Sequence, residues 1–213
     1  MERREPIPLS RSGPATGLPA RVARETDLET VTTIITAAFA ADPVWGPAFP
    51  EDAGSTLRRD LWRPSLAAAL RFPWTWLTAG DEATSVWIPP GEPDMTHEQE
   101  EAFTSVVVDR LGPTARAVMD LFGRFNAAHP RDEPHYYLTL IGTNPDHRGG
   151  GFGMRLLADN LARIDAEKMP AYLESTNPAN DARYGRLGFE PIGAFEGYVP
   201  GTVITTMWRR ARR

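Results

Sequence analysis

Residues 144–154 read Asn-Pro-Asp-His-Arg-Gly-Gly-Gly-Phe-Gly-Met, with four glycines between positions 149 and 153. The almost continuous apolar stretch 136–141 precedes them, as expected of a strand in the centre of a covered sheet. A helical pattern follows, whose apolar face carries Phe152, Leu156, Leu157, Leu161 and Ile164. A strand that passes through a glycine-rich turn into a helix brings free backbone N–H groups and the positive end of the helix dipole to one point. Such a point attracts phosphate.

The spacing of the glycines separates the classes of phosphate ligand. A dinucleotide fingerprint places glycines at relative positions 1, 3 and 6, but the sixth residue counted from Gly149 is Met154. A P-loop ends in Gly-Lys-Ser/Thr, and the only lysine of the chain is Lys168, far into the following helix. The sequence therefore excludes both common nucleotide motifs.

The string that remains is Arg-x-x-Gly-x-Gly, residues 148–153, and it resembles the acetyl-CoA loop of the GCN5-related N-acetyltransferase (GNAT) family. A second string, Asn-Pro-Ala-Asn-Asp-Ala-Arg-Tyr-Gly-Arg-Leu-Gly-Phe at 177–189, is similar to the family's other signature, in which an Asn and a Tyr lie beside the cofactor arm. The resemblance is strong over residues 135–208 and looser over 20–90. HYYLTLIG, PAYLEST and SVWIPPG are most similar to the puromycin N-acetyltransferase-like branch, whereas Thr143 and Asn180 depart from the usual family residues.

The resemblance implies an α/β GNAT fold. This fold has a mixed, mostly antiparallel central sheet with helices on both faces and a V-shaped splay between two parallel central strands, here about 136–142 and 171–175. Acetyl-CoA, the cosubstrate, is implied to enter the splay. The residues implied to bind it are Leu140, Ile141, Gly142, Thr143, Arg148, Gly149, Gly150, Gly151, Phe152, Gly153, Met154, Asn177, Asn180 and Tyr184.

The implied reaction is direct attack of an acceptor amine on the acetyl thioester, and it assigns three roles. A backbone N–H near Leu140 or Ile141, where members of the family carry a β-bulge, is implied to be the oxyanion donor. Tyr184 is the candidate acid for the departing thiolate, or else a tyrosine that packs a helix on the sheet. Glu174, which interrupts an apolar strand where the cleft should open, is the candidate base, or else part of a structural salt bridge. His135 is the rival base, or else makes a structural hydrogen bond.

The acceptor is the least determined part of the prediction. Trp45, Phe49 and Trp62 either form an apolar pocket with the helices of residues 96–128, which would suit a small-molecule amine, or belong to the core. Acetylation of a protein or peptide amine is one alternative function. A CoA-binding module without catalysis is another.

Composition and charge narrow the possible domain count, partners and location. The 213 residues are 41% hydrophobic and 24% charged, which predicts a single globular domain at 20–213 after a flexible leader at 1–19. The resemblance implies that this domain is an N-acetyltransferase. A net charge of −5 argues against nucleic acid and anionic membranes as partners. The chain has no cysteine, and no cluster of His and carboxylates at ligand spacing, so no metal is expected. Without a signal-like or membrane-spanning apolar run, we expect a cytoplasmic protein. Its oligomeric state is expected to be monomer or homodimer, which the sequence does not decide.

Overall fold

The computed structural model describes residues 19–49 and 56–212, so the predicted leader lies, except for Pro19, outside the described residues. Its centre is a seven-stranded sheet in the order β1-β2-β3-β4-β5-β7-β6. The strands are β1 (Ala20–Val22), β2 (Thr75–Thr78), β3 (Ala83–Ile88), β4 (Tyr136–Thr143), β5 (Ala171–Ser175), β6 (Glu190–Glu196) and β7 (Val203–Arg209). Only β4 and β5 pair in parallel, and the other neighbours are antiparallel. The predicted mixed sheet is confirmed.

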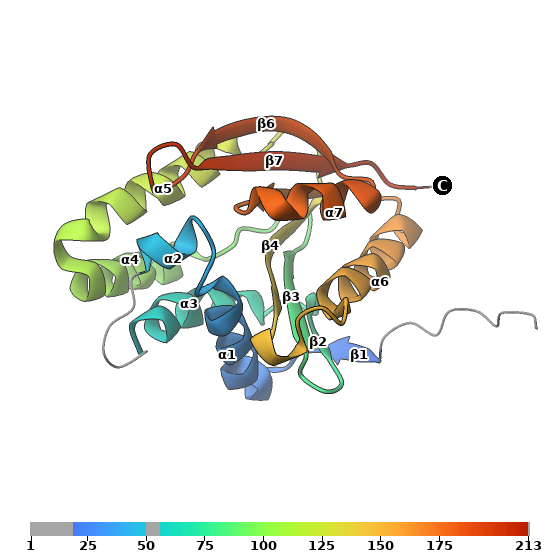
Figure 1. Cartoon of the computed structure of the whole chain (residues 1–213), viewed down its shortest axis with the longest axis horizontal. Coiled ribbons are helices and arrows are strands. Elements are labelled where there is room, and N and C mark those ends of the chain that lie inside the picture. Colours follow the sequence, from blue (N-terminus) through green and yellow to red (C-terminus); the bar gives the residue numbers. More distant parts are fainter. Residues whose placement is uncertain (1–18, 50–55, 213) are drawn as a thin grey trace, which may run out of the picture.

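Helices cover both faces of this sheet (Figure 1). They are α1 (Leu28–Phe39), α2 (Trp45–Ala48), α3 (Thr56–Ala69), α4 (His97–Leu111), α5 (Ala115–Ala128), α6 (Phe152–Ala166) and α7 (Asp181–Arg186). Short 3-10 turns precede or join several of them, at Glu25–Asp27, Gly112–Thr114, Pro145–His147 and Pro178–Asn180. None of the described helices is both long and apolar enough to cross a membrane.

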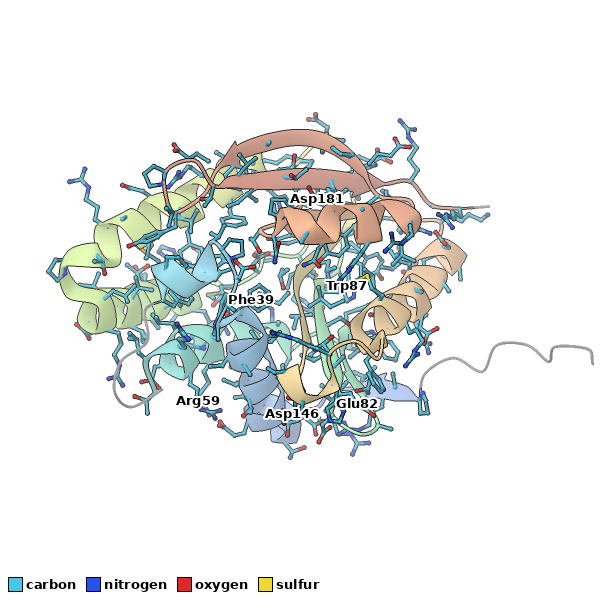
Figure 2. The ribbon with its side chains drawn as sticks, viewed as in Figure 1. Phe39, Arg59, Glu82, Trp87, Asp146 and Asp181 are labelled. Carbon is cyan, nitrogen blue, oxygen red and sulfur yellow. The ribbon has the colours of Figure 1, made fainter. Side chains whose placement is uncertain are left out.

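Two buried clusters form the core, one on each face of the sheet. The first lies between the sheet and helices α1 through α5. To this cluster α1 contributes Val31, Ile34 and Ile35, which lie at helical spacing. The second joins α6 and α7 with the sheet through the leucines of the predicted α6 face. In this second cluster Trp87 of β3, labelled in Figure 2, is fully buried. Its indole N–H donates to the side-chain oxygen of Asn160 of α6 at 3.0 Å.

A β-bulge in β4 changes which face its side chains reach. Val86 of β3 pairs with Leu140 and Trp87 pairs with Leu138, so Thr139 is the extra residue. Leu138 therefore packs in the α6 cluster, while Leu140, two residues later, packs in the α1 cluster. The Thr139 hydroxyl donates to the carbonyl oxygen of Val86 at 3.2 Å.

The parallel pairing of β4 and β5 is short. It joins Tyr136–Leu138 to Ala171–Leu173 and stops there, although β4 continues to Thr143 and β5 to Ser175. From Thr139 onward, the edge of β4 that faces β5 has no strand partner. The structure thus has the splay that the family resemblance implied.

Two elements have no counterpart in the sequence analysis above. Trp45–Ala48 forms one helical turn, because the Asp42 carboxylate accepts the N–H groups of Val44 and Trp45 at 2.9 and 3.0 Å. The edge strand β6 had no predicted counterpart. Nearly every residue of β6 is exposed, so the strand lacks the apolar alternation that marks a half-buried strand in a sequence.

Candidate active site

The glycine loop connects the end of β4 to α6 and has the geometry of an anion site. Gly149 and Gly151 have φ angles of 84° and 72°, in the left-handed region that favours glycine. The first backbone hydrogen bond of α6 runs from Arg155 N–H to Gly151 O at 3.0 Å. The N–H groups of the three residues between them, 152–154, therefore precede the helical ladder and are available to an anion.

Close packing explains two of the other glycines. A Cβ at Gly153 would lie 2.7 Å from the hydroxyl of Thr143, so glycine lets α6 start directly against β4. A Cβ at Gly142 would lie 3.0 Å from Ala38 of α1 and 3.1 Å from Ile35. These glycines therefore bring both helices close to β4 at the place where the sheet opens.

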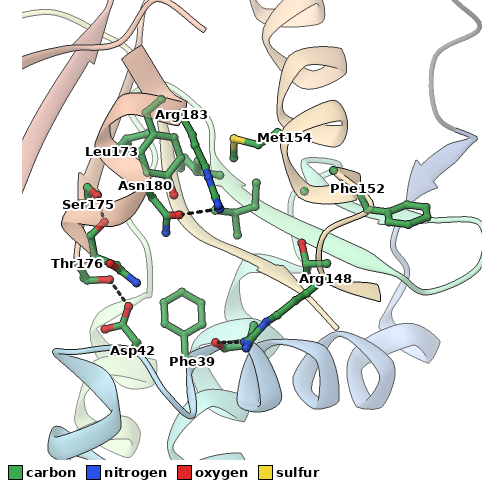
Figure 3. Close-up of a pocket in the computed structure, with 18 of the residues that line it drawn as sticks. Phe39, Asp42, Arg148, Phe152, Met154, Leu173, Ser175, Thr176, Asn180 and Arg183 are labelled. Carbon is green, nitrogen blue, oxygen red and sulfur yellow. Dashed lines mark hydrogen bonds between the residues drawn. The ribbon is translucent and has the colours of Figure 1, made fainter. Parts of the chain in front are cut away.

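A cavity of about 580 Å³ occupies the gap between β4 and β5 (Figure 3). Its wall includes the end of α1, the glycine loop, the start of α6, and α7. The predicted site residues that line it are Ile141, Thr143, Arg148, Gly149, Gly151, Phe152, Gly153, Met154, Glu174, Asn177, Asn180 and Tyr184. One cavity thus joins both sequence signatures.

Three predicted residues do not line the cavity. Leu140 points into the α1 cluster with 8% of its surface exposed, and Gly142 lies under α1. Gly150 is exposed, and a Cβ there would meet the Phe152 ring at 2.6 Å. Leu140 therefore offers no side chain to a ligand in the cavity, and the two glycines have none to offer. The backbone of Leu140 and Gly142 still belongs to the part of β4 that does not pair with β5.

Comparison with known proteins agrees with this geometry. The model of the Acetyltransferase (GNAT) family matches residues 69–189, more than half of the chain. The chain belongs to the GNAT acetyltransferase family. It is an N-acetyltransferase, and members of its family use acetyl-CoA.

Solved GNAT structures have the same fold. A Corynebacterium glutamicum protein, described as histone acetyltransferase HPA2 and related acetyltransferase, is 21% identical with a TM-score of 0.64, over 93% of this chain and 98% of that one. The Drosophila melanogaster polyamine N-acetyltransferase is 14% identical with a TM-score of 0.62, over 90% and 98%. Arylalkylamine N-acetyltransferase 2 of Aedes aegypti is 11% identical with a TM-score of 0.64, over 92% and 100%. At these identities the likeness concerns the fold alone.

In this acetyltransferase, Glu174 is the first residue of β5 after the pairing with β4 ends. Its side chain is half-buried in the cavity wall, and Oε1 has no hydrogen-bond partner among the described residues. Burial raises the pKa of the carboxyl to about 8, against the opposing effect of the Tyr137 and Tyr172 hydroxyls beside it. The nearby carboxylate of Asp94 adds to the rise. A carboxyl with this pKa can exchange a proton near neutral pH.

Tyr184 lies on α7 and lines the same cavity with only 7% of its surface exposed. Burial raises the pKa of its hydroxyl to about 12, and the negative charges of Asp42 and Asp181 act in the same direction. Arg183 opposes them. The phenol therefore keeps its proton at any pH at which the protein would be assayed, as a general acid must.

The rival base, His135, is not in the cavity wall. Its side chain is buried, and Nδ1 lies 2.7 Å from the carbonyl oxygen of Glu133, so Nδ1 carries the proton. Nε2 lies 3.1 Å from Nε2 of His129, within hydrogen-bond distance. Both ring nitrogens of His135 are thus used within the fold, which favours the structural role that the sequence left open.

The aromatic residues proposed for an acceptor pocket are core residues. Trp45, Phe49 and Trp62 have 6%, 1% and 5% of their surfaces exposed. Their ring centroids lie 5.0 to 5.2 Å apart, and Trp45 also stacks on Phe125 of α5. None of the three lines the cavity, so their burial favours the second alternative that the sequence left open, in which they belong to the core.

Other residues of the wall had no assigned role in the sequence. Phe39 and Asp42 come from the end of α1 and the residues after it, and the Thr176 hydroxyl donates to Asp42 Oδ2 at 2.7 Å. Arg183 and Arg186 come from α7. The side chain of Asp42 meets Thr176, more than a hundred residues away, only through folding, so no local pattern could have shown the contact.

No group of three or more His, Cys, Asp or Glu residues in the described part of the chain is placed to hold a metal ion.

Proposed function

We propose that this acetyltransferase transfers the acetyl group of acetyl-CoA to a primary amine of a small molecule, by direct attack in a ternary complex. The observation that carries the proposal is the single cavity that joins the glycine loop to Glu174 and Tyr184. A phosphate site and a pair of groups suited to proton transfer, placed along one cleft, match a phosphate-bearing donor whose reactive end is an acyl group.

The residues present fit acetyl-CoA. The left-handed glycines and the start of α6 offer N–H groups to the diphosphate. The unpartnered edge of β4, from Thr139 to Thr143, can pair with the amides of the pantetheine arm as an added strand would. Asn177 and Asn180 line the other side of the cleft.

Each protein group has one proposed task in the reaction. Acetyl-CoA supplies the thioester carbonyl that the amine attacks. Glu174, in its ionised form, takes a proton from the acceptor ammonium, and Tyr184 gives a proton to the departing sulfur. A backbone N–H near Leu140 or Ile141, next to the bulge at Thr139, stabilises the developing oxyanion.

Three fold neighbours support a small amine as acceptor, since their names specify agmatine, polyamine and arylalkylamine N-acetyltransferases. The peptide alternative has support as well, from a neighbour that is a ribosomal-protein-S18-alanine N-acetyltransferase. Within the family we propose the puromycin N-acetyltransferase-like branch, on the sequence strings given above. The cytoplasmic location stays a prediction.

The direct test measures acetyl-CoA binding by calorimetry and thiol release over a panel of amines. We expect binding, and turnover on at least one small-molecule amine. Turnover confined to peptide amines would favour the alternative acceptor. Binding without turnover on any amine would favour a CoA-binding module, and the absence of binding would contradict the whole proposal.

Tyr184→Phe tests the proposed acid. Removing one hydroxyl should lower kcat by about 10- to 100-fold, because the thiolate would leave without its proton donor. The dissociation constant of acetyl-CoA should change less than about threefold, since the ring still fills its place beside Phe189. Unchanged kcat would remove Tyr184 from the mechanism.

A further inference from the structure

Three arginines line the cavity, and they come from opposite arms of the cleft. Arg148 lies in the loop that follows β4, whereas Arg183 and Arg186 lie on α7, which follows β5. Because β4 and β5 diverge, the two sets lie on different sides of the gap. Figure 3 shows Arg148 beside α1 and Arg183 on α7. The family resemblance indicated Arg148 alone.

No described carboxylate lies within ion-pair distance of any of these three guanidinium groups. Arg183 Nη1 donates only to the neutral amide oxygen of Asn180 at 3.2 Å. Arg148 Nη2 donates to the carbonyl oxygen of Ala38, at the end of α1, at 3.0 Å. Three arginines without acidic partners around one cavity are unexpected in a chain with a net charge of −5.

The helical geometry of α7 divides its residues by task. Arg183 and Arg186 are three residues apart and so share one side of the helix, and both are exposed. Tyr184, between them, is turned inward and buried. The residue proposed to act on the sulfur and the cations that line the cleft therefore project from a single helical turn.

Coenzyme A carries a 5′-diphosphate and a 3′-phosphate, which is more negative charge than one arginine and a helix start would neutralise. We propose that Arg183 and Arg186 form a second phosphate-binding wall, across the cleft from the glycine loop, that holds phosphate groups of the coenzyme. This inference rests on the proposed function. Guanidinium groups suit the task because their planar donors match phosphate oxygens.

The test compares the affinity of three donors for wild type, Arg183→Gln, Arg186→Gln and the double variant. The donors are acetyl-CoA, 3′-dephospho-acetyl-CoA and S-acetyl-pantetheine, which has no nucleotide phosphates. We expect acetyl-CoA to bind about tenfold more weakly for each single variant and about a hundredfold more weakly for the double variant. S-acetyl-pantetheine should bind all four proteins alike.

Binding of 3′-dephospho-acetyl-CoA identifies which phosphate Arg183 and Arg186 bind. If the arginines bind the 3′-phosphate, 3′-dephospho-acetyl-CoA will not distinguish the variants from wild type. If the arginines bind the diphosphate, 3′-dephospho-acetyl-CoA will bind the variants more weakly than wild type, as acetyl-CoA does. In either case the wild-type affinity should fall with added salt more steeply than that of the double variant.

Arg116→Gln is the matched control. Arg116 is an exposed arginine of α5 that does not line the cavity. It removes the same charge and should leave acetyl-CoA affinity within about twofold, because exposed charges beyond contact distance are screened. Arg183→Lys should recover part of the loss.

Equal weakening of all three donors would mean that the arginines only support α7, and it would overturn the inference. Unchanged acetyl-CoA affinity in the double variant would overturn it too. Wild-type protein that binds none of the donors would instead contradict the proposed function, so the two failures are distinguishable.

Discussion

Replacing Glu174 by Gln should make the protein less active and, at neutral and alkaline pH, more stable. Burial is the main reason that the pKa of the Glu174 carboxyl rises from its ordinary 4.5 to about 8. Between these two values the folded protein keeps a proton that the unfolded chain has released. The stability of wild type should therefore fall as pH rises from about 4.5 to about 8, and the fall should end above the folded pKa.

The magnitude follows from the same pKa. Each pKa unit corresponds to about 1.4 kcal/mol, so the rise from 4.5 to about 8 sets an upper limit of about 5 kcal/mol. Glu174 lines a cavity of about 580 Å³, large enough to admit water, which lowers the cost of the charge. We therefore expect the free energy of unfolding of Glu174→Gln to gain roughly 2 to 3 kcal/mol relative to wild type between pH 5 and pH 9.

Urea unfolding followed by the fluorescence of the six tryptophans, at several pH values, measures this difference. The exposed Glu190, changed to Gln, is the control and should give a curve parallel to that of wild type. In the same samples kcat should fall by about 100-fold or more for Glu174→Gln, and the rise of wild-type kcat/KM towards a plateau above about pH 8 should be lost. Parallel stability curves for wild type and Glu174→Gln would refute the argument from burial, and an unchanged pH–rate profile would refute the role as base.

Three further changes test other parts of the structure. Gly151→Ala should cost about 1 kcal/mol of stability, because an L side chain is strained at a φ of 72°, and should also weaken acetyl-CoA binding in a calorimetric titration. The pKa of His129 is lowered from 6.5 to about 4 by burial and by neighbouring His135. Between these two values His129 stays neutral in the folded protein but is protonated in the unfolded chain. Wild-type stability should thus fall as pH drops from about 6.5 to 4, and His129→Gln should show a shallower fall in acid unfolding. Asp165→Asn leaves the guanidinium of Arg209, 3% exposed and held by two 2.7 Å bonds, without its counter-charge. It should lose about 3 kcal/mol in urea unfolding, and a loss below about 1 kcal/mol would show the pair to be dispensable.

The parts of the fold that could be predicted are those set by neighbours in the chain. The glycine loop, α6 and β5 each have a local cause: left-handed glycines, an apolar face at helical spacing, and a short apolar run bounded by Pro170. Strand β5 begins at Ala171 and ends at Ser175, as the sequence predicted. Their arrangement in a splayed sheet came from the family resemblance, not from the local pattern.

The parts that could not be predicted depend on contacts between distant residues. The family resemblance implied a bulge near Leu140 or Ile141, but its position at Thr139 depends on how β3 and β4 pair on both sides of it. Nothing in β4 alone marks the extra residue. Trp45 reads equally well as a pocket residue or a core residue until its neighbours are known. Arg183 and Arg186 read as ordinary surface charge, and only the position of α7 on the far arm of the cleft gives them a shared cavity with Arg148.

The short ladder between β4 and β5 has a mechanical consequence. Three residue pairs are all that join strands β1 to β4 with strands β5, β7 and β6 in one continuous sheet. The sheet thus consists of two half-sheets that are hydrogen-bonded to each other at one end, so a change in the width of the open end would break none of the hydrogen bonds between strands. A ligand whose amides bond to β4 while its other side contacts β5 and α7 would fasten the open end, so amide exchange should slow on both half-sheets together.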